Sequence, residues 1–369
     1  MIDRLFWNGK RVLLTGHTGF KGSWASLVLK SLGADVYGFS QPPTDPRNLF
    51  VAANLERDIH HRIGDIRDSE AVQLAMVEAA PDIVIHMAAQ PLVRASYATP
   101  VYTYATNVMG TVHVLESARH ISSVRAVVIV TSDKCYENTG TSRGYRETDE
   151  MGGHDPYSNS KGCAELVTSG YRRSFFGKPG ATQIATGRAG NVIGGGDWSA
   201  DRLLPDAIRS FIGNQSLRIR HPEAIRPWQH VLDPIIGYLR LAEYLVAREG
   251  DFAEGWNFGP SADSEVPVRH IVDRVAALWG NNASWEVDGR EQLHEASYLR
   301  LDCSKAATRL GWRSAVDLDQ ALQLTVDWYR AFQRGEDLRA LTLAQIEAVL
   351  GHSDQSTGKV EARAHKALS

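Results

Sequence analysis

Short, fully apolar runs alternate along this chain with glycine turns and longer amphipathic stretches. The first run, Val12–Thr15, leads into a glycine-rich turn, and a helical pattern follows to about Leu32, where Gly33 ends it. Residues 34–39 then form a second apolar run with the length of a buried strand. A strand, a glycine turn, a helix and a second strand together predict one βαβ unit.

The same alternation continues through the first half of the chain. Further buried strands are predicted at 83–85, 127–130 and 183–185, with helices at about 101–119 and 157–175 between them. Continuous apolar strands that alternate with helices are typical of a parallel sheet covered on both faces. The pattern therefore predicts an α/β fold with a Rossmann-type, doubly wound parallel sheet.

The pattern changes after about Arg188. Glycines at 194–196 and repeated prolines divide the second half of the chain into short pieces. Helical patterns return at about 268–279 and 318–330. We therefore expect a second, smaller lobe whose segments interleave with the first.

These changes of pattern set the predicted domain boundaries. We expect residues 1–188 to form the first, Rossmann-type domain, with a return segment at about 228–260. Residues 189–350 are predicted to form mainly the second lobe. Residues 351–369 are polar and lack an apolar pattern, which is typical of a mobile tail.

Composition narrows the class of function. The chain has 369 residues, with 40 Lys+Arg against 43 Asp+Glu, so its charge gives no argument for binding nucleic acid or an anionic membrane. It contains no apolar stretch of transmembrane length and no signal-peptide pattern. Its 3 cysteines lie far apart and indicate neither a disulfide framework nor a metal site, which fits a reducing cytoplasm.

The glycine turn has the spacing of a dinucleotide-binding motif. Gly16, Gly19 and Gly22 stand between a predicted strand and a predicted helix, and this context favours a binding site over an ordinary glycine-rich turn. Gly16 permits the tight turn, Gly19 lets a pyrophosphate approach the backbone, and Gly22 lets the helix pack closely on the strand. The helix N-terminus would then face the phosphates.

Other candidate cofactor contacts follow the later strands. The second strand lacks the usual acidic residue for the adenosine ribose; Ser40 stands there, and because no arginine adjoins it for a 2′-phosphate, NAD is favoured over NADP. Asp65 and Ile66 suit an adenine contact, although a surface Asp is the alternative. The small Ala88 and Ala89 would let the cofactor lie close. We add Thr18, Phe20, Lys21 and Asn107 as candidate cofactor contacts.

A polar segment follows the predicted strand at 127–130, at the edge where reactive groups of open α/β sheets gather. It contains Ser132, Asp133 and Lys134. The alternative is a polar turn in which Asp133 caps a helix. Together with a bound dinucleotide, the segment predicts an oxidation site.

Tyr157 and Lys161 are four residues apart, which on a helix places both side chains on one face. A lysine ammonium beside a phenol favours the phenolate and lowers its pKa. We therefore expect Tyr157 to accept a proton from a sugar or alcohol hydroxyl while hydride leaves the same carbon. A half-buried Tyr and a solvated Lys are the structural alternative for this spacing alone.

Several longer segments carry a resemblance to a known family. They are GHTGFKGSW (16–24), HMAAQPLVRASY (86–97), TNVMGT (106–111), TSDKCYEN (131–138), DPYSNSKGCAELV (155–167), RAGNVIGGGDW (188–198), RPWQHVL (226–232) and WNFGP (256–260). On these segments the chain resembles the extended short-chain dehydrogenase/reductases and, within them, the CDP-glucose branch of the nucleotide-sugar 4,6-dehydratases. The dTDP-glucose branch carries Asp-Glu where this chain has Asp133-Lys134.

The resemblance implies a lyase that converts CDP-glucose to CDP-4-keto-6-deoxyglucose and water. Tyr157 would take the 4-hydroxyl proton while the C4 hydride passes to NAD+, and Lys161 would lower the phenol pKa and hold the nicotinamide ribose. Ser132 would bind the new 4-keto oxygen. Asp133 would protonate the leaving 6-hydroxyl before the hydride returns to C6. Lys134 is either the base at C5, which requires a neutral amine, or a stabiliser of the enolate.

The resemblance also implies the substrate contacts and the setting of the reaction. Asn191 and Arg226 match family positions that contact the diphosphate, where a planar guanidinium suits paired phosphate oxygens. Further candidates are Arg202, Leu204, Arg218 and Tyr298. The family suggests a homodimer or homotetramer, and a deoxysugar for a surface polysaccharide such as the lipopolysaccharide O-antigen.

Two other functions remain open from the sequence. A nucleotide-sugar 4-epimerase or decarboxylase would share the glycine turn and the Tyr/Lys pair, but it would not need Asp133 and Lys134. An NAD-binding sensor or scaffold would not need the catalytic residues at all.

Overall fold

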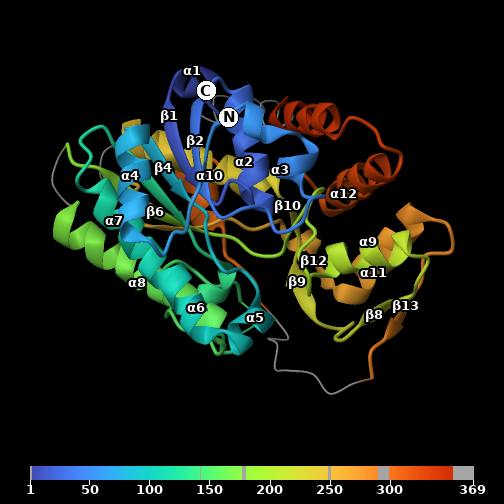
Figure 1. The fold of residues 1–369 in the computed structure, drawn as a ribbon. Coiled ribbons are helices and arrows are strands. Elements are labelled where there is room, and N and C mark those ends of the chain that lie inside the picture. Colours follow the sequence, from blue (N-terminus) through green and yellow to red (C-terminus); the bar gives the residue numbers. More distant parts are fainter. Residues whose placement is uncertain (1, 142, 177–179, 248–250, 290–298, 352–369) are drawn as a thin grey trace, which may run out of the picture.

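The computed structural model describes residues 2–141, 143–176, 180–247, 251–289 and 299–351. At its centre is a seven-stranded sheet in the order β11-β6-β5-β4-β1-β2-β3, and all neighbouring strands are parallel (Figure 1). The strands are β1 (Arg11–Thr15), β2 (Asp35–Ser40), β3 (His60–Ile63), β4 (Ile83–His86), β5 (Ala126–Val130), β6 (Gln183–Arg188) and β11 (Gly255–Asn257).

Each face of this sheet has its own apolar core, because alternate residues of a strand point to opposite faces. Val12 and Leu14 belong to one cluster of buried side chains, and Leu13 belongs to the other. One face is covered by α2 (Phe20–Ser31) and α10 (Leu232–Ala247), and the other by α4 (Ser69–Ala79), α7 (Gly110–Ala118) and α8 (Pro156–Phe175). The predicted doubly wound parallel sheet is confirmed.

The helix predicted at 101–119 is present, but it is not α-helical throughout. It consists of α6 (Pro100–Tyr104), a π-helical turn η2 (Ala105–Met109) and α7. The π-helical turn contains Asn107, whose side-chain amide accepts a hydrogen bond from the Gln90 N–H and donates to the Ser160 hydroxyl. The departure from α-helical geometry therefore coincides with tertiary hydrogen bonds.

Short strands and turns separate the helices of the second half of the chain, where prolines and glycines are frequent. Three pairs of short strands lie outside the central sheet: β7 with β10, β8 with β13, and β9 with β12. Their bounds are β7 (Val192–Ile193), β8 (Leu217–Ile219), β9 (Ile225–Pro227), β10 (Gln229–His230), β12 (Glu265–Pro267) and β13 (Trp285–Val287). The helices among them are α9 (Leu203–Ile212) and α11 (Val268–Trp279).

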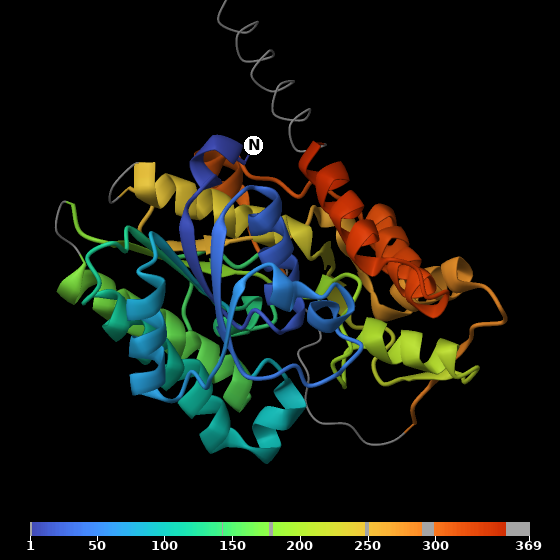
Figure 2. The ribbon, with the colours of Figure 1, turned by 45° about the horizontal axis from the view of Figure 1, so that its top comes forward.

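The last described helices return to the first lobe. The helix α12 (Leu318–Gln333) packs on α11, β10 and β7, and the helical residues 338–351 lie beside the region that follows β2 (Figure 2). Arg339 pairs with Asp58, and Arg4 pairs with Glu347 at 2.7 Å. No described helix is both long and apolar enough to span a membrane. The remaining short elements are α1 (Arg4–Trp7), α3 (Leu49–Ala52), η1 (Leu55–Arg57), α5 (Val93–Ala98), η3 (Asp133–Cys135), η4 (Ala262–Ser264) and η5 (Ala306–Leu310).

Candidate active site

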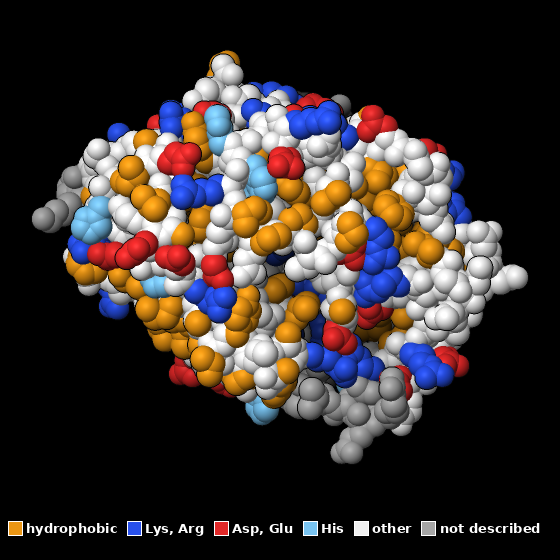
Figure 3. Space-filling model, in the orientation of Figure 1, with side chains coloured by type: hydrophobic (Ala, Val, Ile, Leu, Met, Phe, Trp, Pro, Cys, Tyr) orange, Lys and Arg blue, Asp and Glu red, His pale blue; other side chains and the backbone are white. Residues whose placement is uncertain are grey.

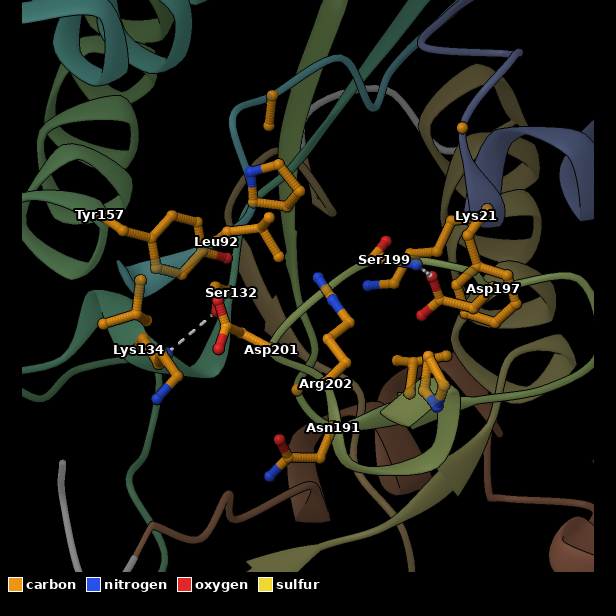
Figure 4. A pocket seen from close by; sticks show the side chains of 18 of the residues that line it. Lys21, Leu92, Ser132, Lys134, Tyr157, Asn191, Asp197, Ser199, Asp201 and Arg202 are labelled. Atoms are coloured by element: carbon orange, nitrogen blue, oxygen red, sulfur yellow. Dashed lines mark hydrogen bonds between the residues drawn. The ribbon is translucent and has the colours of Figure 1, made fainter. Parts of the chain in front are cut away.

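A cavity of about 1120 Å³ lies between the central sheet and the second lobe. On the sheet side its wall is formed by the segments that follow β1 to β6, which is where open α/β sheets bind ligands. Figure 3 shows the hollow between the two lobes, with Lys and Arg side chains beside it. In Figure 4, Tyr157, Ser132 and Lys134 lie on one side and Lys21 and Asp197 on the other.

The glycine turn has the geometry that a dinucleotide requires. Gly16 has φ +79°, and a Cβ there would lie 2.8 Å from the Ala88 backbone nitrogen. A Cβ at Gly22 would lie 2.1 Å from the Gly16 carbonyl oxygen, so helix and turn pack too closely for any side chain. A Cβ at Gly19 would meet only the Gly16 carbonyl oxygen, at 3.3 Å. Gly19 also begins α2 without a side-chain cap, so the first amides of the helix are available to an anion.

Polar contacts fix the turn against the end of β2. The Thr18 hydroxyl lies 2.8 Å from the Ser40 hydroxyl and donates to the Gln41 carbonyl. Asn48 donates its side-chain amide to the Thr18 carbonyl at 3.0 Å. Because Ser40 also lines the cavity, it can both support the turn and face a ribose.

The other predicted cofactor residues fall into two groups. Asp65 lines the cavity and accepts hydrogen bonds from Arg67. These hydrogen bonds lower the pKa of Asp65 to about 2, although burial acts in the opposite direction. Phe20, Lys21, Ile66, Ala88 and Ala89 line the same cavity. Asn107 does not line it: the side chain is 2% exposed and holds the backbone of Gln90. Asn107 therefore supports the loop after β4, and its contact with the cofactor stays a prediction.

The Tyr157 and Lys161 side chains come from the first turns of α8. Asp155 caps this helix by accepting the Ser158 N–H, and Pro156 occupies its first position. The Lys161 amine donates to the Val130 carbonyl at 3.2 Å and so joins α8 to the end of β5. Burial lowers the pKa of Lys161 to about 8.

The pKa of the Tyr157 phenol lies above its ordinary value, against the expected lowering by Lys161. Burial raises the pKa of Tyr157 to about 12, although a hydrogen bond with Ser132 and the charge of Arg202 oppose the rise. Desolvation penalises the phenolate more than its neighbours stabilise it. The cation whose charge opposes the rise is Arg202, from the second lobe.

Ser132, Asp133 and Lys134 form a compact turn after β5. The backbone N–H of Lys134 donates to the Ser132 hydroxyl at 3.2 Å, so Ser132 is the residue that caps this turn, rather than Asp133. The Ser132 hydroxyl donates to Asp133 Oδ1 at 2.9 Å. Asp133 Oδ2 is buried and has no hydrogen-bond partner among the described residues. A Cβ at Gly190 would lie 1.8 Å from this oxygen.

Cationic side chains reach the cavity from both lobes. Burial, with the charges of Arg202 and Lys161, lowers the pKa of Lys21 to about 7. Arg94 and Arg220 approach Asp201 at 3.6 and 3.8 Å. Sequence reasoning missed Arg94, Arg220 and also Asp197, although Arg94 and Asp197 stand inside the matched segments 86–97 and 188–198.

The predicted substrate residues differ in whether they line the cavity. Asn191, Arg202, Leu204 and Arg226 line the cavity. Arg218 lies at its edge, where its side chain is 65% exposed and pairs with Glu286 at 2.8 Å, which makes it a weak candidate. Tyr298 lies outside the described residues.

The chain is similar in sequence to nucleotide-sugar 4,6-dehydratases. The family model described as GDP-mannose 4,6 dehydratase matches residues 13–325. The chain is 54% identical over 351 residues to the CDP-glucose 4,6-dehydratase of Salmonella typhimurium, which covers 94% of this chain and 98% of that protein. It is 29% identical over 338 residues to a probable dTDP-glucose 4,6-dehydratase of Sinorhizobium fredii, which covers 86% of this chain and 92% of that protein.

Solved structures share the fold. A double mutant of the dTDP-glucose 4,6-dehydratase of Streptomyces venezuelae, with NAD bound, matches with a TM-score of 0.75 at 25% identity, over 89% of this chain and 99% of that one. The UDP-glucose 4-epimerase of Thermotoga maritima also has a TM-score of 0.75, at 22% identity over 87% and 99% of the two chains, a likeness in fold alone. The resemblance to the nucleotide-sugar 4,6-dehydratases is confirmed, and the chain belongs to the GDP-mannose 4,6-dehydratase family.

Proposed function

We propose that this protein is a CDP-glucose 4,6-dehydratase, a hydro-lyase that converts CDP-glucose into CDP-4-keto-6-deoxyglucose and water. The observation that carries the proposal is that one cavity joins a dinucleotide-binding glycine turn to Ser132, Asp133 and Tyr157. The 54% identity to the enzyme of Salmonella typhimurium supports the choice of CDP-glucose.

The cavity wall around the glycine turn has the features of an NAD site. Gly19 and the free amides of α2 would receive the pyrophosphate, and Ser40 would receive the adenosine ribose. The small side chains of Ala88 and Ala89 leave room beside the turn. When bound, NAD+ supplies the group that accepts hydride from the sugar and later returns it.

Tyr157 is the proposed base of the first step. As a phenolate it takes the proton of the sugar 4-hydroxyl. Ser132, its hydrogen-bond partner, then turns its hydroxyl from Asp133 Oδ1 and donates to the 4-keto oxygen. Lys161 lies one helical turn away, with its amine positioned by the Val130 carbonyl. Because burial raises the pKa of Tyr157 to about 12, the cations of the cavity are needed to favour the phenolate.

Asp133 and Lys134 are proposed to carry out the loss of water. The 4-ketone acidifies the C5 proton, which Lys134 either removes itself or helps to release by stabilising the enolate. Asp133 protonates the departing 6-hydroxyl. Its Oδ2 suits this role, since it is buried and makes no hydrogen bond to any described residue.

The second lobe offers a proposed site for the diphosphate. Arg202 Nε and Arg220 Nη1 are buried and have no hydrogen-bond partner among the described residues. Arg226 and Asn191 line the same cavity. Paired phosphate oxygens would satisfy such guanidinium groups. Arg218 has a smaller part in this proposal because Glu286 already neutralises it.

Incubation with CDP-, dTDP-, GDP- and UDP-glucose tests the proposal. We expect a 4-keto-6-deoxy product from CDP-glucose at a kcat/KM at least about tenfold above the others, and we expect Tyr157→Phe to abolish it while still binding CDP. Absence of this product from all four sugars would contradict the proposed function. A C4 epimer from UDP-glucose would favour the epimerase alternative.

We also propose that the protein is a dimer built through α6 and α8. Exposed apolar side chains gather there: Val101 is 82% exposed and Leu166 is 62% exposed. The two helices are joined by a hydrogen bond from the Tyr104 hydroxyl to Asn159. Figure 3 shows hydrophobic side chains on the lower left of the molecule, where α6 and α8 lie in Figure 1. Contiguous exposed apolar area of this kind marks an interface.

We infer that the reaction takes place in the cytoplasm. All three cysteines are free, which suits a reducing compartment. The product is an activated keto sugar, so a ketone-reducing or aminating enzyme must consume it before a glycosyl transfer. A lipopolysaccharide O-antigen is the destination that the resemblance implies, and loss of this polysaccharide on gene deletion is the expected result.

A further inference from the structure

A buried carboxylate lies directly behind the catalytic side chains. Glu165 of α8 accepts hydrogen bonds from Arg188 Nε and Nη2 at 2.9 and 2.8 Å. It also accepts the hydroxyls of Thr131 at 2.6 Å and Thr186 at 2.7 Å. The side chains of Glu165 and Arg188 are 5% and 6% exposed. Both carboxylate oxygens are therefore fully engaged. Of these four residues only Thr131 lines the cavity, and Glu165 itself does not.

The Arg188 guanidinium extends the network to a third strand of the sheet. It donates to the Tyr136 hydroxyl at 2.6 Å, and that hydroxyl donates to Asn257 of β11 at 2.6 Å. The network thus joins α8 to the segments that follow β5 and to the strands β6 and β11. The hydrogen bonds and the charge of Arg188 overcome the cost of burial and hold the pKa of Glu165 below its ordinary value.

The carboxylate connects two sets of catalytic groups. Tyr157, Lys161 and Glu165 follow one another at intervals of four residues on α8, so they share one face of the helix. Thr131, which donates to Glu165, is the residue before Ser132 in the chain. The helix that carries the proposed base is therefore joined, through one carboxylate, to the main chain that carries Ser132 and Asp133.

Stability alone is a weak reason for such a network. Taking an ion pair out of water costs free energy, and well-packed apolar residues in its place are often as stable or more stable. What an ion pair adds over an apolar contact is fixed direction, because each hydrogen bond has a preferred geometry. Catalysis needs that direction, since a displacement of about 1 Å can cost about 10²-fold in rate.

We infer that Glu165 is a positioning residue: through the Thr131 hydroxyl it fixes Ser132 and Asp133 relative to Tyr157 and Lys161. The inference rests on the proposed roles of those four residues. Glu165 does not touch the substrate in this account. Its effect passes through the backbone of Thr131.

Two threonines provide a matched test. Thr131→Val and Thr186→Val each remove one hydroxyl that donates to the same carboxylate, at 2.6 and 2.7 Å. Both side chains are buried, and valine keeps the shape of threonine in each case. Only Thr131 is joined to Ser132 by a peptide bond, so a purely structural role predicts equal effects, whereas a positioning role predicts unequal ones. Because Thr131 also lines the cavity, amide exchange measured without ligand is needed to separate positioning from a direct contact with substrate.

We expect Thr131→Val to lower kcat for CDP-glucose by about tenfold or more with KM changed by less than about twofold. Thr186→Val should lower the melting temperature similarly but leave kcat within about twofold. Thr131→Ser, which restores a hydroxyl, should recover most of the lost kcat. Equal kcat in the two valine variants, or no recovery in Thr131→Ser, would overturn the inference.

Amide hydrogen exchange provides a second measurement, one that does not depend on catalytic turnover. Amide exchange of the peptide covering residues 131–136 should be about tenfold faster in Thr131→Val than in the wild type, and unchanged in Thr186→Val. Equal exchange in all three proteins would overturn the inference. If the wild type failed to convert CDP-glucose, the proposed function would fail, while the exchange rates would still decide the role of Glu165.

Discussion

Single residues of the cavity differ in how far the sequence could predict them. The spacing of Tyr157 and Lys161, and the place of Ser132 after a strand, follow from periodicity and chain order. Arg94 and Arg220 carry no such signal, because only the folded chain brings them to Asp201. The direction of the Tyr157 pKa shift could not be predicted from the sequence either, because it depends on burial as well as on neighbouring charge.

The Asp133 carboxylate packs directly against Gly190, with no room for a side chain at that position. A methyl group at position 190 would lie 1.8 Å from Asp133 Oδ2, so the carboxylate must move. We expect Gly190→Ala to lower kcat by about 10²-fold, because the proposed acid leaves its position, while the Kd for CDP changes little. Steady-state kinetics and calorimetric titration with CDP measure the two effects.

Gly289→Ala is the matched control for this variant. A Cβ at that position meets no atom of a described residue within 4 Å, so kcat should equal that of the wild type. A Gly190→Ala protein with normal kcat would show that the position of Asp133 does not matter, and would count against its role as the acid.

Regular elements were predicted where local sequence decides them. The unit β1, glycine turn, α2 and β2 follows from an apolar run, three glycines and Gly33, all local in the chain. The π-helical turn η2 did not follow, because Asn107 makes its hydrogen bonds to residues distant in the sequence. The short strands of the second lobe were likewise too brief to give a periodic signal.

The contact between β1, the turn and α2 leads to a prediction about two glycines. Gly22→Ala should destabilise the protein by about 1–3 kcal/mol, because its Cβ would overlap the Gly16 carbonyl oxygen. Gly19→Ala should change stability far less but weaken NAD binding, since its methyl group would enter the space for the pyrophosphate. Urea unfolding and NAD titration distinguish the two variants. Weaker NAD binding in Gly22→Ala together with lower stability in Gly19→Ala would contradict this packing.

The whole molecule presents an apolar surface on α6 and α8 that a second copy would cover. We expect the wild type to have the mass of a dimer or tetramer in light scattering, and Leu166→Glu to shift it toward the monomer. Leu74→Glu is the control: Leu74 is also exposed, at 57%, but lies on α4. A monomeric wild type, or equal dissociation by both variants, would contradict the proposed interface.

In the proposed function, the hydride taken from C4 returns to C6 of the same sugar. CDP-glucose labelled with deuterium at C4 tests this most directly, with the product examined by NMR. The account predicts CDP-4-keto-6-deoxyglucose that carries the deuterium at C6 and a solvent-derived hydrogen at C5. Deuterium found at C4 of an epimer, or lost to the solvent, would contradict it.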